Sequence, residues 1–125
     1  MWIFTNKSFL SVVEHYDQKK YKDVMVVRAR RSNDLKAAFP HAEIIETFDS
    51  DYRFRVFVTR RTVQRFLNDA VDDIDYDNFK DSIAPEENER HSAYLKVWMA
   101  MNSFQDNPKK RTGYDLLIGD SKNDE

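Results

Sequence analysis

The clearest pattern along the chain is the alternation of apolar and polar positions in residues 52–59, "YRFRVFVT". Successive side chains of a β-strand point to opposite faces of its sheet. One face of this predicted strand is therefore apolar and carries Tyr52, Phe54, Val56 and Val58. The opposite face carries Arg53, Arg55, Phe57 and Thr59. The pattern predicts a half-buried strand that presents arginine on its outer side.

Further strands and helices follow from shorter patterns. Apolar, β-branched runs predict strands over residues 9–16, 24–30 and 42–48. Residues 32–39, closed by Pro40, predict a short helix. After Thr59, which can cap a helix, apolar residues recur at the helical spacing i, i+3, i+4 and i+7, namely Val63, Phe66, Leu67, Ala70, Val71 and Ile74. Two more helices are predicted, a short one over residues 76–83 and a longer one that starts at Pro85.

The order of these elements is ββαββα followed by two C-terminal helices. Such an order predicts an α+β fold with a four-stranded, mostly antiparallel sheet and helices packed on one face. Residues 1–106 are predicted to form a single domain, and the polar residues 107–125 a mobile C-terminal tail. The other face of the sheet would then be open to solvent or to a partner, unless the C-terminal helices cover it.

Charge is distributed unevenly along the chain. The formal net charge is −2, but residues 1–65 contain 13 Lys+Arg against 8 Asp+Glu, whereas residues 66–125 contain 7 against 14. There is no cysteine, which excludes disulfide and thiolate chemistry and favours a cytoplasmic location. Nothing in the sequence is typical of a signal peptide, and no apolar run approaches the ~20 residues of a membrane span. We therefore expect no membrane partner.

Arginine is concentrated in one part of the sequence, because eight of the ten arginines lie between Arg28 and Arg65. Strand alternation places two of them about 7 Å apart on the open face, and two more join them from the strand over residues 24–30. A further two occupy the first turn of the following helix, where the dipole disfavours cations but backbone N–H groups suit an anion. The predicted anion-binding or partner-binding site therefore consists of Arg28, Arg30, Arg53, Arg55, Arg60 and Arg61.

Two other interpretations of these arginines compete with a binding site for a protein surface. They could be neutralised inside the chain by Glu14, Glu43, Glu46 and the acidic C-terminal half. Alternatively, arginines interleaved with Tyr16, Tyr21 and Phe57 would suit single-stranded nucleic acid, by phosphate contacts and base stacking.

Motifs for catalysis or metal binding are missing. The acidic run at residues 72–81 resembles a calcium-binding loop, but Asn78 and Ala84 stand where that loop needs glycine and glutamate. His15, His41 and His91 do not have the spacing of metal ligands. P-loops, serine-nucleophile motifs and dinucleotide fingerprints are absent. We therefore predict no catalytic residue, no metal and no cofactor.

Several segments of the sequence resemble a family of short, functionally uncharacterised bacterial and phage proteins. The resemblance covers about residues 1–105 and is carried by "MWIFTNKSFLSVV", "VVRAR", "SDYRFRVFV", "DYDNFKD" and "YLKVWMAM". It implies a compact accessory protein of a bacterium or its phage, and it implies no particular activity, cofactor or site.

The leading hypothesis from the sequence is a non-enzymatic binding module for an anionic surface, most naturally on a protein and alternatively on a nucleic acid. A homodimer is compatible with the sequence. A second hypothesis is a phage-type inhibitor of a host enzyme or defence complex, acting through Trp2, Phe4 and the apolar segment at residues 114–119. The third is a small phosphate-handling enzyme in which His15 or His41 acts with a carboxylate.

Overall fold

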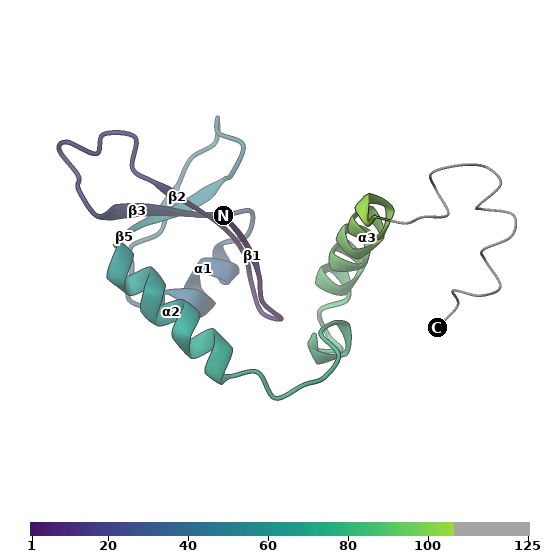
Figure 1. The fold of residues 1–125 in the computed structure, drawn as a ribbon. Coiled ribbons are helices and arrows are strands. Elements are labelled where there is room, and N and C mark those ends of the chain that lie inside the picture. Colours follow the sequence, from purple (N-terminus) through teal and green to yellow (C-terminus); the bar gives the residue numbers. More distant parts are fainter. Residues whose placement is uncertain (107–125) are drawn as a thin grey trace, which may run out of the picture. The chain divides into compact units, whose positions relative to one another are not determined.

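The computed structural model describes residues 1–106 in two compact units, Met1–Ala84 and a second unit that starts at Pro85 (Figure 1). The predicted tail at residues 107–125 lies outside the described residues. The first unit contains the sheet and two α-helices, and the second contains one long α-helix.

An antiparallel sheet of five strands forms the first unit, so the α+β class with an antiparallel sheet is confirmed and the prediction of four strands is wrong. The strands are β1 (Trp2–Phe4), β2 (Phe9–Glu14), β3 (Val24–Ala29), β4 (Ile45–Glu46) and β5 (Phe54–Thr59), in the spatial order β1-β2-β3-β5-β4. The unpredicted strand is β1, which pairs with β2. It has only three residues, all apolar, so alternation could not reveal it.

The predicted strand over residues 42–48 is reduced to Ile45–Glu46. The chain before it is not extended, because the Ala42 N–H donates to the Phe39 carbonyl at 3.1 Å and closes a turn after the first helix. The Ala42 N–H is therefore not available to a longer β4.

Both α-helices of the first unit, α1 (Ser32–Ala38) and α2 (Arg60–Asp72), lie on the same side of the sheet (Figure 1). The core lies between them and the sheet, and its fully buried residues include Leu10, Val27 and Val56 of three neighbouring strands and Leu35 of α1. As predicted, Thr59 caps α2, because its Oγ1 accepts from the Thr62 N–H at 3.1 Å. We call the side of the sheet opposite these helices the outer face.

Tyr52 is not on the core face, so this part of the predicted alternation is wrong. It precedes β5, which begins at Phe54, and it does not belong to the core cluster. Its ring instead lies against the guanidinium groups of Arg28 and Arg30. Residues 49–53 bend, so the alternation of the strand does not extend back to Tyr52.

Only one α-helix follows α2 in the described residues, instead of the predicted two. The predicted helix over residues 76–83 is a single 3₁₀ turn, Lys80–Ser82. The helix α3 spans Asn88–Phe104 and begins three residues after the predicted start at Pro85. Among residues 1–106, no helix is long and apolar enough to span a membrane.

Candidate anion-binding face

One row of side chains runs across the outer face and contains a residue from each strand. The strand register places Trp2 opposite Ser11, Ser11 opposite Arg28, Arg28 opposite Arg55, and Arg55 opposite Ile45. We call Arg28 and Arg55 the arginine pair. Two cations directly opposite each other on neighbouring strands destabilise a sheet. Whether the arginine pair has this effect depends on the groups that surround it.

The backbone brings the arginine pair particularly close together. The Arg60 N–H donates to the Asp23 carbonyl at 2.9 Å, which makes residues 23 and 60 a hydrogen-bonded pair at the end of the β3–β5 ladder. Hydrogen-bonded and non-hydrogen-bonded pairs alternate along an antiparallel ladder. Arg28 and Arg55 lie five pairs further along and therefore form a non-hydrogen-bonded pair, in which Cα atoms are only about 4.5 Å apart.

Neither member of the arginine pair has a carboxylate partner within the first unit. Arg28 Nη2 donates to Ser11 Oγ at 2.7 Å, and Arg55 Nη2 donates to Ser50 Oγ at 3.0 Å. Both acceptors are neutral hydroxyls, and no carboxylate of residues 1–84 forms an ion pair with either guanidinium. The Nε atoms of both arginines are buried without a hydrogen-bond partner in the described chain. The pair thus carries two positive charges and unused donors.

Tyr52 supports one side of the arginine pair. The guanidinium carbon of Arg28 lies 4.7 Å from the centre of the Tyr52 ring, and that of Arg30 lies 4.3 Å from it. Arg30 also donates through Nη1 to the Asp51 carbonyl at 3.0 Å and approaches Asp51 Oδ1 at 3.4 Å. Arg30 is therefore next to the pair, but it has a carboxylate partner of its own.

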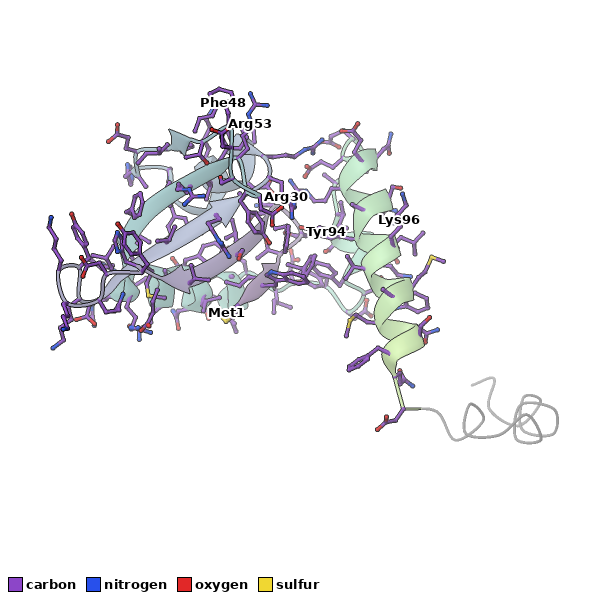
Figure 2. The ribbon with its side chains drawn as sticks, turned by 90° about the horizontal axis from the view of Figure 1, so that it is seen from above. Met1, Arg30, Phe48, Arg53, Tyr94 and Lys96 are labelled. Atoms are coloured by element: carbon purple, nitrogen blue, oxygen red, sulfur yellow. The ribbon has the colours of Figure 1, made fainter. Side chains whose placement is uncertain are left out.

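Arg53 does not join the pair. Its Nε donates to Glu46 Oε2 at 2.7 Å, and its guanidinium lies over the ring of Phe48 at 5.0 Å. Figure 2 shows Arg53 and Phe48 together, near the end of the β4–β5 hairpin, with Arg30 further along the sheet. The predicted neutralisation by Glu46 therefore applies to this arginine.

Arg60 and Arg61 are separate from the pair as well. They follow Arg55 by five and six residues, which corresponds to about 16 Å or more along an extended strand. Arg60 Nη2 donates to Glu14 Oε2 at 2.9 Å, so Glu14 neutralises it as the competing interpretation predicted. Arg61 is exposed and has no ion-pair partner in the first unit. The six predicted residues therefore divide into the arginine pair, Arg30 beside it, Arg53 at the hairpin, and two at the start of α2.

Aromatic residues that the sequence did not connect with the arginines lie on the same face. The rings of Phe4 and Phe9 stack with centres 4.5 Å apart, and the edge of Trp2 meets Phe9 at 6.0 Å. The Trp2 side chain is 68% exposed. The contribution of the segment at residues 114–119 to an apolar interface lies outside the described residues.

The histidines do not form a metal site in residues 1–106, where no group of three potential metal ligands occurs. The ring of His15 packs among Tyr16, Tyr21 and Phe57, with ring centres 4.4–5.7 Å away. Its Nδ1 accepts from the Asp17 N–H at 3.0 Å. His15 thus takes part in an aromatic cluster and a local turn.

These observations define the first unit as an α+β domain with an unneutralised arginine pair on its outer face. Comparison of the chain with protein-family models, with curated proteins and with solved structures finds no match. No activity can be carried over from a relative, so the function is inferred from the site itself.

Proposed function

We propose that the protein is a non-enzymatic binding module whose outer face binds an anionic group of a partner between Arg28 and Arg55. The observation that carries this proposal is the arginine pair, two arginines opposite each other in the strand register, neither of which has a carboxylate partner in the first unit. An oxyanion placed between them would accept charge-assisted hydrogen bonds from both, and such bonds are about twice as strong as neutral ones.

The energetic argument depends on the cost of the pair without a ligand. Like charges directly opposite each other are destabilising by up to about 1 kcal/mol, and a buried donor without a partner costs about 1–3 kcal/mol more. Proteins tolerate a loss of stability at functional sites, where the arrangement that lowers stability is the one that binds the ligand. Arg30 and Tyr52 would hold Arg28 in place beside the bound anion.

The charge of the first unit favours an acidic protein surface as the partner. Residues 1–84 contain 14 Lys+Arg and 14 Asp+Glu, so this unit has no net positive charge. Tight binding to nucleic acid depends on many phosphate contacts, whereas one or two carboxylates suffice to occupy the arginine pair. The exposed Trp2 in the same row also suits a protein interface, where Trp and Arg are frequent among the residues that dominate affinity.

The anion site can be tested by NMR titration of the full chain with sodium sulfate, at ionic strength matched by sodium chloride. We expect the Nε–H resonances of Arg28 and Arg55 to shift together and to saturate. Arg55→Met should abolish the response of Arg28, whereas Arg61→Met, which removes an exposed arginine outside the pair, should leave it unchanged. Shifts of equal size at Arg61 and at the pair would show general ion screening and would refute the proposal.

The partner class can be tested with two probes on the same resonances, a hexaglutamate peptide and a 12-residue oligothymidylate. We expect the peptide to shift the resonances of the pair at concentrations where the oligonucleotide does not. If the oligonucleotide bound more strongly than the peptide, and Arg55→Met abolished this binding, the anion site would be supported. The partner would then be single-stranded nucleic acid and not an acidic protein surface.

A further inference from the structure

The outward edge of β5 has backbone groups without a partner. The Thr47 N–H donates to the Arg53 carbonyl at 2.7 Å, so the backbone groups of Arg53, and by alternation those of Arg55 and Phe57, point toward β4. However, β4 starts at Ile45, opposite Arg55. The N–H and C=O of Phe57 therefore point past the end of β4, and they have no backbone partner in residues 1–106.

A hollow of about 370 Å³ lies directly beside this edge, on the side of the helices. Apolar residues from three segments line most of it, namely Phe39, Ala42, Val58 and Phe66. Arg65 and Asp69 of α2 also line it. The turn at Phe39–Ala42, which the hydrogen bond from the Ala42 N–H to the Phe39 carbonyl closes, forms one of its walls. Its volume lies within the range of about 300–1,000 Å³ that is typical of ligand pockets.

We propose that the edge of β5 at Phe57 binds an extended segment of a partner protein by strand addition, with an apolar side chain of that segment in the hollow. This proposal does not rest on the arginine pair. The Phe57 N–H and C=O would pair with one residue of the segment, as in other domains that bind peptides at a sheet edge. Because side chains alternate along a strand, the bound residue beside Val58 would enter the hollow, and the one beside Phe57 would cover the Phe57 ring.

The geometry favours a short peptide over a second copy of the chain. The unpaired edge extends only over Val56–Thr59, between the end of β4 pairing and the start of α2. Pairing of two such edges would supply few bonds and little of the roughly 1,200–2,000 Å² that a stable protein interface buries. A peptide of this length is sufficient to use the edge and the hollow together. The edge also lacks the lysines or prolines that commonly protect exposed strands, and Phe57 is 43% exposed there.

The test uses a yeast-displayed library of random octapeptides, selected against the full chain and then synthesised with blocked ends. We expect selected peptides to share one large apolar residue and to protect the Phe57 amide from hydrogen exchange. Phe57→Pro removes the outward N–H but no bond to β3, and it should weaken binding at least about tenfold. The matched variant Phe57→Ala keeps this N–H and should bind more tightly than Phe57→Pro.

A second pair of variants keeps the test decisive if Phe57→Pro does not fold. Ala42→Phe fills the hollow and should weaken binding at least about tenfold, whereas Ala37→Phe adds the same bulk at an exposed position of α1 outside the hollow and should not. Failure to select any peptide, or equal binding by Ala42→Phe and wild type, would overturn the proposal. So would a wild-type dimer that these variants dissociate, because a second copy would then occupy the edge.

Discussion

Replacing Arg55 by methionine is expected to stabilise the protein in chloride solution, although it removes a charged residue and a hydrogen bond. Methionine retains much of the apolar stem by which arginine packs on its neighbours. The substitution removes the repulsion between Arg55 and Arg28 and the buried Nε that lacks a partner. What is lost is the bond to Ser50, an exposed hydroxyl that water can solvate instead.

The expected gain is about 1 kcal/mol in the free energy of unfolding. Relief of the like-charge pair contributes about 0.2–1 kcal/mol, and removal of the unsatisfied donor about 1–3 kcal/mol. Loss of the Ser50 hydrogen bond and of some packing offsets about 1 kcal/mol of this.

Urea unfolding measures this change, since urea is uncharged and does not itself screen the pair. A double-mutant cycle with Arg28→Met isolates the interaction between the two arginines. Either single substitution relieves the repulsion, so the double variant should gain about 0.2–1 kcal/mol less than the sum of the two single gains. In sodium sulfate the coupling should change sign, because the anion needs both arginines.

The reasoning would be refuted if the double-mutant cycle in chloride gave a favourable coupling energy between the two arginines, or none. The pair would then already be neutralised in the protein. Arg61→Met serves as the control, and as an exposed residue outside such a pair it should change stability by less than about 0.5 kcal/mol. A gain at Arg61 equal to that at Arg55 would mean that overall charge, and not the pair, determines stability.

Two more predictions concern the residues that position the outer face. Tyr52→Ala should lower the free energy of unfolding by about 3 kcal/mol in urea, because it removes a large buried ring that lies against Arg28 and Arg30. Tyr52→Phe keeps the ring and should change the stability little. Equal losses in the two variants would contradict a role of the ring. Thr59→Ala should lower the free energy of unfolding by about 1 kcal/mol, because the cap of α2 is lost. Thr59→Asn supplies another capping oxygen and should restore most of this stability. No recovery in Thr59→Asn would mean that the methyl group of Thr59 matters more than its oxygen.

The sequence could predict which side chains of β5 face inward and could not predict which arginines meet. Alternation assigned Phe54, Val56 and Val58 correctly to the core, and the helical spacing placed α2. These patterns depend on neighbours along the chain. The pairing of Arg28 with Arg55 depends on the register between two strands, at positions 27 residues apart, which no local pattern determines.

The ion-pair partners of the other arginines could not be predicted from the sequence either. The sequence offered Glu14 and Glu46 as candidates, but only the β2–β3 and β3–β5 pairings bring Glu14 to Arg60, and only the β4–β5 pairing brings Glu46 to Arg53. Tyr52 was assigned to the core because alternation was extended beyond the actual start of the strand. The fold class followed from local patterns, whereas the composition of the site required tertiary structure.

The arrangement of ion pairs also separates the arginine pair from Arg53 and Arg60. Exposed ion pairs contribute only about 0–1 kcal/mol each, so Arg53 with Glu46 and Arg60 with Glu14 neither stabilise the fold strongly nor leave a charge available. The arginine pair differs, because its like charges lower the stability of the first unit and no carboxylate there offsets this effect.

The proposed peptide-binding edge uses the backbone of Phe57 on the same strand, but neither guanidinium group of the arginine pair. Arg55→Met should therefore abolish the sulfate response and leave peptide binding intact, whereas Ala42→Phe should do the reverse. Loss of both responses in either variant would mean that the two sites are one.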